Sequence, residues 1–136
     1  MDKIIFVCTG NTCRSPLAES YARMKYPDMD ISSRGLFVVE ERTNSRSLNI
    51  IEENNLPAPT PPKQLTAEDV QKAKLVVMGR SHKEAILGRW PDADVRLVSE
   101  YAGETSVDIP DPYGGTQSQY EEVFLHLKEY IEKFNW

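Results

Sequence analysis

The chain has 136 residues, of which 40% are hydrophobic and 27% charged, and its formal net charge is −5. This length and composition are typical of one globular domain, so we expect residues 1–136 to fold as a single domain without a structural metal or disulfide. The acidic balance argues against binding nucleic acid or a membrane through a basic surface. No apolar run is long enough for a signal peptide or a transmembrane helix, so we expect a cytoplasmic protein.

The N-terminal half begins with the short apolar run Lys3–Val7, which is typical of a buried parallel strand. Ser15 followed by Pro16 is typical of an N-cap with proline at the first helical position, so a helix is expected at Ser15–Lys25. The next three elements are a strand, a helix and a proline-rich loop, expected in turn within Ile31–Val39, at Ser45–Glu53 and at Leu56–Pro62.

Capping boxes mark two helix starts in the C-terminal half, at Thr66 and at Ser81. The apolar runs Lys74–Met78 and Val95–Val98 predict the third and fourth strands. The last helix is expected from about Ser118. Its apolar face consists of Tyr120, Val123, Phe124, Leu127, Ile131 and Phe134, and its polar face of Glu121, Glu122, Lys128, Glu129 and Lys133.

Strands that alternate with helices predict an α/β fold, with a parallel sheet covered by helices on both faces. Ligands of such sheets bind at the carboxyl ends of the strands. Cys8 directly follows the first predicted strand. The sequence therefore places this cysteine at the mouth of a binding site.

The segment Val7–Pro16 leaves a strand through a short loop and enters a helix N-terminus. Backbone N–H groups in such a loop can point inward and bind an anion, with help from the helix dipole. Arg14 adds a planar group that holds two oxygens of a tetrahedral oxyanion. The same surroundings favour the thiolate of Cys8, and a hydrogen bond donated by the Ser15 hydroxyl favours it further. A nucleophile at the base of an oxyanion site indicates attack on phosphorus.

Other interpretations of this segment remain. A free cysteine after a strand is commonly a packing residue, and Cys-x5-Arg-Ser is by itself a permissive pattern. A Walker-type nucleotide loop is excluded, because no Gly-Lys-Ser or Gly-Lys-Thr closes the loop. Cys8 and Cys13 are the only cysteines and lie in one short segment, so they predict neither a disulfide framework nor a zinc site.

Thiolate attack on a phosphoryl group needs a general acid on the leaving-group side. Asp111 is the outstanding candidate, because Pro110 and Pro112 stiffen the loop around it. Asp108 is the alternative acid and lacks this bracket. A simple turn before the last helix is the other interpretation of the Asp-Pro pair.

The loop of residues 8–15 together with Asp111-Pro112-Tyr113-Gly114 resembles the low-molecular-weight protein-tyrosine-phosphatase family over the whole chain. The resemblance implies a flavodoxin-like three-layer sandwich of the phosphotyrosine phosphatase I type, whose four parallel strands lie in the order 2-1-3-4. It implies that Cys8 is the nucleophile and forms a phosphocysteine, and that Asp111 protonates the leaving group and then activates water. It also implies that Ser15 stabilises the thiolate, that Asn11 holds the loop, and that no metal or cofactor takes part. The implied phosphate-binding residues are Thr9, Gly10, Asn11, Thr12, Cys13 and Arg14.

The resemblance also matches Cys13 to a second loop cysteine that forms a reversible disulfide with the nucleophile, although a packing role for Cys13 is equally open. Family members often have a histidine that supports the loop asparagine, and here that neighbourhood, residues 60–66, has none. We expect His82 and His126 to be surface residues. Arg34, Arg42 and Arg46 lie on segments that can border the pocket.

Thr12 is the clue to the substrate. Tyrosine-specific members usually have isoleucine there, whereas the similar bacterial protein-arginine phosphatases have threonine. Tyrosine-specific members also tend to carry a second aromatic residue after the one at Tyr113, at the position of Gly114. We therefore expect Thr12 and Tyr113 to influence substrate selectivity. We therefore expect a phosphatase of phosphorylated proteins that prefers phosphoarginine and acts as a monomer. The alternatives are a tyrosine phosphatase, an arsenate reductase, which would need further cysteines downstream, and a non-catalytic phosphopeptide binder.

Overall fold

The computed structural model describes residues 3–134, and its centre is one four-stranded sheet in the order β2-β1-β3-β4. Every pair of neighbouring strands is parallel. The strands are β1 (Lys3–Cys8), β2 (Asp30–Gly35), β3 (Ala73–Val77) and β4 (Val95–Leu97). The predicted α/β class and strand order are therefore confirmed.

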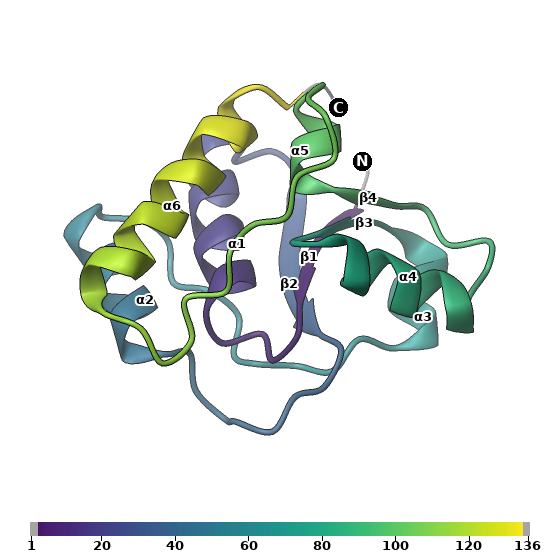
Figure 1. Cartoon of the computed structure of the whole chain (residues 1–136), viewed down its shortest axis with the longest axis horizontal. Helices are drawn as coiled ribbons and strands as arrows, with labels where there is room; N and C mark the ends of the chain where they lie inside the picture. Colours follow the sequence, from purple (N-terminus) through teal and green to yellow (C-terminus); the bar gives the residue numbers. More distant parts are fainter. Residues whose placement is uncertain (1–2, 135–136) are drawn as a thin grey trace.

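Helices form a layer on each side of this sheet (Figure 1). One layer consists of α1 (Arg14–Lys25), α2 (Ser45–Glu53), α5 (Val98–Tyr101) and α6 (Gln117–Glu132). The other layer consists of α3 (Ala67–Lys72) and α4 (Arg80–Arg89). In the part of the chain from residue 3 to residue 134, no helix has the length and apolar character needed to cross a membrane.

The two layers enclose two separate hydrophobic clusters, because successive side chains of a strand point to opposite faces. Ile4 and Phe6 of β1 join the cluster under α1 and α6, whereas Ile5 and Val7 join the cluster under α3 and α4. Cys8 continues the alternation on the α1 side at the end of the strand. The central strand is therefore buried on both faces and fixes where the loop after it begins.

Two predicted helix starts are wrong. Ser15 is not an N-cap: α1 begins at Arg14 after Cys13, and its cap position makes no side-chain hydrogen bond. Ser81 does not open a capping box either, because α4 begins at Arg80 after Gly79. Both serines stand in a short polar pattern that resembles the pattern of true caps. The cap of α4 comes instead from Asp108, in a distant part of the chain. The hydroxyl of Ser15 contacts Cys8.

The remaining boundaries differ by small shifts. The predicted second strand ends at Gly35, β3 lies one residue earlier than predicted, and Val98 begins α5 instead of ending a strand. The Thr66 capping box is confirmed, and α6 starts from a similar box formed by Thr116 and Gln119. The apolar face of the last helix is buried as predicted.

Leu127 and Leu125 give a matched test of this core, because both lie in the middle of α6. Leu127 is fully buried and Leu125 is 61% exposed. We expect Leu127→Ala to lower the free energy of unfolding by about 2–5 kcal/mol, through lost burial and the cavity left behind. Leu125→Ala should change it by less than about 0.5 kcal/mol in the same urea titration. Equal losses in the two variants would contradict the packing of α6.

Candidate active site

A cavity of about 240 Å³ opens at the carboxyl end of β1. The loop between β1 and α1 forms its floor, and the segment after β2 and the loop before α6 form its walls. The lining residues are Cys8, Thr9, Gly10, Thr12, Cys13, Arg14, Phe37, Val39, Glu40, Asp111 and Tyr113. The structure thus brings together the two motifs that lie about a hundred residues apart in the sequence, and Asn11 and Ser15 lie directly behind the floor.

Carbonyl oxygens of the loop point away from the cavity. Those of Cys8 and Thr9 accept hydrogen bonds from the amides of Leu36 and Phe37, and that of Thr12 accepts from the amide of Asn44. The N–H of a trans peptide group points opposite to its C=O. The amides that follow these carbonyls therefore point the other way, next to the positive end of α1, and this arrangement supports the prediction that the loop binds an anion.

The sulfur of Cys8 lies 3.0 Å from the hydroxyl oxygen of Ser15. That oxygen already accepts a hydrogen bond from the side-chain amide of Asn11, at 2.7 Å. The Ser15 hydroxyl keeps its own hydrogen for donation, and a hydrogen bond from it to the sulfur favours the thiolate of Cys8. This use of the hydroxyl also explains why Ser15 does not cap its own helix.

Asn11 has a left-handed backbone, with φ of 57°. Its side chain fixes this conformation, because its amide nitrogen also donates to Ser33 Oγ at 2.9 Å and its oxygen accepts from the amide of Lys63 at 3.0 Å. A left-handed non-glycine residue is uncommon and needs such support. Asn11 is fully buried, so these contacts are shielded from water.

Residues 60–66 contain no histidine, and Asn11 is linked instead through Ser33 to a buried carboxylate. Glu19 is fully buried, and it accepts from Ser33 Oγ at 2.6 Å and from both the amide and the hydroxyl of Thr60, at 3.1 and 3.0 Å. An ionised carboxylate only accepts hydrogen bonds. Ser33 must therefore donate to Glu19 and accept from Asn11. The direction of each hydrogen bond from Asn11 in the loop to Glu19 is thus fixed.

Arg14 and Asp111 meet at the cavity. The Arg14 side chain is 8% exposed, donates to the carbonyl of Ile109 at 2.9 Å, and lies 3.7 Å from Asp111 Oδ2. Asp111 Oδ1 accepts from the amide of Tyr113 at 3.1 Å, which holds the carboxylate in its loop. Asp108 is turned away: its Oδ1 accepts from the amide of Arg80 at 2.9 Å and so caps α4. The geometry thus favours Asp111 over Asp108 as the acid.

Gly35 is a structural residue of the site that the sequence did not single out. A Cβ atom there would lie 2.9 Å from the carbonyl oxygen of Thr9 and 3.0 Å from the amide nitrogen of Asn11. Only glycine lets the end of β2 approach the loop so closely. Arg34 beside it does not line the cavity, nor do Arg42 and Arg46; Arg34 is paired instead with Asp69, at 3.2 Å.

The expectation of a surface position is wrong for His82 and confirmed for His126, which is exposed on α6. His82 is 6% exposed, and its Nε2 lies 2.9 Å from the hydroxyl of Thr9. Burial, together with the positive charge of Arg14, lowers the pKa of His82 to about 4. The contact joins residues 73 positions apart, so no local sequence pattern announced it.

Cys13 lines the same cavity as Cys8, and both thiols are free. The Cys13 sulfur lies 3.3 Å from the hydroxyl of Tyr120 on α6. Burial raises the pKa of the Cys13 thiol, although the hydrogen bond from Tyr120 acts in the opposite direction. The Cys8–Cys13 disulfide stays a prediction.

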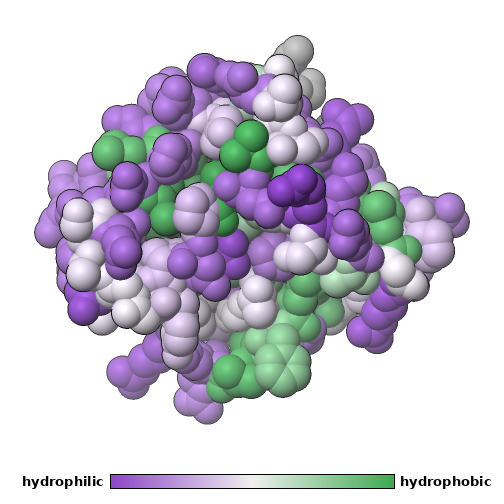
Figure 2. All heavy atoms as spheres, viewed as in Figure 1, coloured by the Kyte–Doolittle hydropathy of each residue, from purple (hydrophilic) through white to green (hydrophobic). Residues whose placement is uncertain are grey.

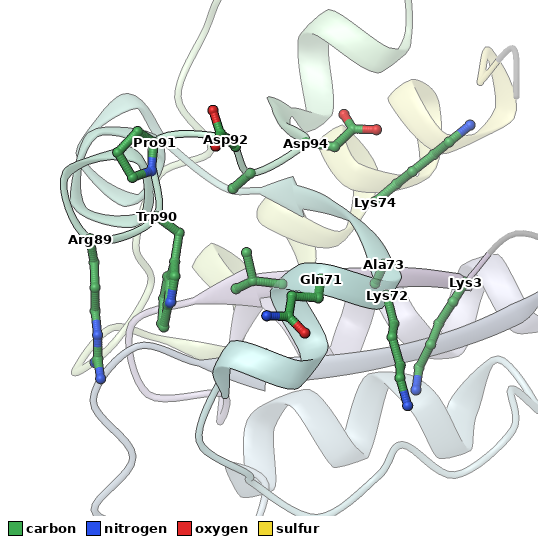
Figure 3. A pocket seen from close by; sticks show the side chains of 12 residues that line it. Lys3, Gln71, Lys72, Ala73, Lys74, Arg89, Trp90, Pro91, Asp92 and Asp94 are labelled. Carbon is green, nitrogen blue, oxygen red and sulfur yellow. The ribbon is translucent and has the colours of Figure 1, made fainter.

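A larger hollow of about 610 Å³ lies at the opposite, amino-terminal end of the sheet (Figure 3). In this view the side chains of Lys3 and Lys72 extend in one direction, and Arg89 runs alongside Trp90. Two of the cations that line it are engaged elsewhere: Lys72 pairs with Glu68 at 2.7 Å, and Arg89 lies over the Trp90 ring at 4.6 Å. No cysteine lines this hollow, whereas Cys8, the predicted nucleophile, lines the smaller cavity, which is therefore the candidate site. Among the described residues, no group of three or more His, Cys, Asp or Glu side chains is placed to hold a metal ion.

A parallel α/β sheet with an anion-binding loop, a free cysteine at its floor and an aspartate at its wall is the arrangement of a small phosphatase. A sequence model of the family described as low molecular weight phosphotyrosine protein phosphatase matches residues 3–135. The chain belongs to this family and is therefore a low-molecular-weight protein phosphatase, with phosphorylated proteins as its substrate class.

Similar proteins are found both among relatives and among solved structures. The low molecular weight protein-tyrosine-phosphatase PtpB of Staphylococcus haemolyticus is 42% identical over 133 residues, which is 96% of each chain. PtpB of Staphylococcus aureus is 39% identical over 133 residues, 96% of this chain and 95% of that one. The YwlE arginine phosphatase from Geobacillus stearothermophilus superposes with a TM-score of 0.92 at 30% identity, covering 98% of this chain and 90% of that chain. A low molecular weight protein tyrosine phosphatase from T. tengcongensis superposes with a TM-score of 0.89 at 29% identity, covering 98% and 97%.

Replacing the buried carboxylate tests the hydrogen-bond chain behind the loop. Glu19→Gln keeps the shape of the side chain but turns one acceptor into a donor, so Ser33 or Thr60 loses its acceptor. We expect the free energy of unfolding to fall by about 1–3 kcal/mol and kcat/KM for an aryl phosphate to fall about tenfold. Glu121→Gln, at an exposed position of α6, is the matched control. Full activity in Glu19→Gln would contradict a role in positioning the loop.

Proposed function

We propose that the chain removes phosphate from phosphorylated arginine side chains of proteins through a cysteine-bound phosphate. Three residues of the cavity carry the chemistry in this proposal. Cys8 is the nucleophile, Arg14 and the inward-facing loop amides bind the phosphoryl oxygens, and Asp111 transfers the proton. The convergence of Cys8, Arg14 and Asp111 on one cavity supports these roles.

The reaction runs in two displacements. The Cys8 thiolate attacks phosphorus while the bond from phosphorus to the arginine nitrogen breaks, and Asp111 gives its proton to that nitrogen. Water then attacks phosphorus, the phosphorus–sulfur bond breaks, and Asp111 takes a proton from the water. Free phosphate leaves, and Cys8 is again a thiolate. Charge on the phosphoryl oxygens is balanced throughout by Arg14 and by the loop amides.

Two substitutions test these roles with phenyl phosphate as substrate. Cys8→Ser should abolish turnover, because a serine hydroxyl is not ionised in this site. Asp111→Asn should lower kcat by about 10²–10⁴, because the phenoxide must then leave without a proton.

Asp108→Asn is the matched control for the acid. Asp108 caps α4, so this variant should lose stability but keep its kcat. Turnover that persists in Cys8→Ser would disprove the assignment of the nucleophile. A loss of kcat in Asp108→Asn as large as that in Asp111→Asn would disprove the assignment of the acid.

Thr12 is the observation that carries the preference for phosphoarginine. Its side chain is 6% exposed and lines the cavity beside the nucleophile. Its hydroxyl lies 3.7 Å from Cys13 Sγ, a distance at which sulfur is a weak partner. A polar group in this place suits a substrate that carries N–H groups, whereas an isoleucine side chain would suit an apolar ring.

The mouth of the cavity supports the same choice. Glu40 and Asp111 both line it, and carboxylates pair well with a planar guanidinium. Apolar side chains gather at the lower edge of Figure 2, over the segment that joins β2 to α2. The large hydrophobic residues exposed there are Phe37 and Val39. These side chains offer apolar surface to the aliphatic part of an arginine.

The similar structures include one named as an arginine phosphatase, and this name supports the proposal. Phosphotyrosine is the second candidate substrate. It is favoured by the names of the Staphylococcus relatives and by the aromatic rings of Phe37 and Tyr113 at the cavity. A monomeric state and a cytoplasmic location stay predictions.

Thr12→Ile tests the substrate preference directly. We expect the native enzyme to have a higher kcat/KM for a phosphoarginine peptide than for a phosphotyrosine peptide of the same sequence. The substitution should reduce this ratio about tenfold or more, because it replaces a hydrogen-bonding group by an apolar one.

Thr12→Ser is the matched control, since it keeps the hydroxyl and removes only the methyl group. It should retain the native preference in the same assay. The phosphoarginine proposal is wrong if the native enzyme prefers phosphotyrosine and Thr12→Ile leaves the ratio unchanged.

A further inference from the structure

His82 reaches the site from the opposite layer of the fold. It lies in the first turn of α4, on the far side of the sheet from α1, and its Nε2 contacts the hydroxyl of Thr9 at 2.9 Å. Thr9 is the first residue after the nucleophile and lines the cavity. The loop is therefore held from two sides, by the Asn11 contacts behind it and by a histidine beside it.

The other ring nitrogen decides how this hydrogen bond runs. Nδ1 of His82 is buried and has no hydrogen-bond partner within residues 3–134. A proton on Nδ1 would leave a buried donor unpaired, which is rarer and costlier in proteins than an unpaired acceptor. The neutral ring therefore carries its proton on Nε2 and donates it to the oxygen of Thr9.

The charged groups around His82 are consistent with a neutral ring at physiological pH. Burial and the charge of Arg14 lower its pKa, to about 4, against the opposite effects of Asp111 and Asp108. A second proton would also have to occupy the unpartnered Nδ1. The ring thus has one N–H at neutral pH, and that N–H is committed to Thr9.

A hydroxyl whose oxygen accepts from His82 has its own hydrogen to donate elsewhere. Thr9 is exposed on its cavity side, where the loop amides and Arg14 already form an anion site. We propose that His82 is a positioning residue that orients the Thr9 hydroxyl as a further donor to the phosphoryl group. This rests on the proposed phosphatase site but not on the choice between phosphoarginine and phosphotyrosine.

Four variants test the proposal with phenyl phosphate as substrate and inorganic phosphate as the bound probe. Thr9→Val and His82→Leu should each lower kcat/KM about tenfold and weaken phosphate binding, because each removes one oriented donor. The double variant should be no worse than either single variant, since His82 acts through Thr9. His82→Gln places an amide N–H near the position of Nε2 and should stay within about threefold of the native enzyme.

The native protein provides a test that does not depend on the folding of any variant. The ring ¹⁵N resonances of His82 should show a protonated Nε2 and an unprotonated Nδ1 from pH 8 to about pH 5. His126→Leu is the control for a histidine lost from the surface and should bind phosphate normally.

Three results would overturn the proposal. One is a proton on Nδ1 in the native protein at neutral pH. Another is a double variant whose losses multiply to about a hundredfold, because the two residues would then act separately. The third is a His82→Gln enzyme as impaired as His82→Leu. If any of these results is found while Cys8→Ser abolishes turnover, the proposed nucleophile stands and only the role of His82 is rejected.

Discussion

The left-handed backbone of Asn11 is the constraint on which the site depends. A loop that wraps around a phosphoryl group must turn its amides inward, and this needs a backbone conformation that side chains disfavour. The side chain of Asn11 offsets that cost with three hydrogen bonds, to Ser15, Ser33 and the amide of Lys63. The same residue therefore shapes the loop and contacts the Ser15 hydroxyl that lies against the sulfur of Cys8, the proposed nucleophile.

These polar contacts are stable only because the two hydrophobic layers exclude water around them. A buried carboxylate such as Glu19 is costly unless each of its oxygens is hydrogen-bonded. The hydroxyl of Ser33 and the amide and hydroxyl of Thr60 donate to its oxygens, so Glu19 accepts every one of these hydrogen bonds. Glu19 thus sets the direction of the hydrogen bonds from Asn11 to Ser33 and from Ser33 to Glu19. The other hydrogen bond of the Asn11 amide reaches Ser15, next to Cys8. Fixed direction of this kind costs no reorganisation when charge develops in the reaction.

An anion site in a chain with a net charge of −5 is not a contradiction. The positive potential comes from Arg14, from oriented amides and from the end of α1, and only the first of these counts in the formal charge. Two carboxylates, Glu40 and Asp111, also line the cavity, so acidic and anion-binding groups lie within one small site.

The sequence by itself determined what depends on neighbouring residues. The alternation of apolar runs and helices defined the α/β class, and the capping box at Thr66 formed as predicted. The strand–loop–helix setting of Cys8 and Arg14 predicted an anion loop. The family resemblance supplied the strand order, which local patterns do not encode. Local pattern failed at Ser15, whose hydroxyl contacts Cys8, and at Ser81, because Asp108 from a distant loop caps α4 instead.

Only the tertiary structure decided which distant residues support the loop. Glu19 meets Thr60 across 41 positions, Asn11 meets Lys63 across 52 and Thr9 meets His82 across 73. The cap of α4 comes from Asp108 in a later loop, which also removed that residue from consideration as the acid. Such contacts arise because parallel strands bring segments that are remote in sequence to one edge of the sheet. The geometry of these contacts depends on how whole layers of helices pack on the sheet. It therefore cannot be predicted from the residues of one segment alone.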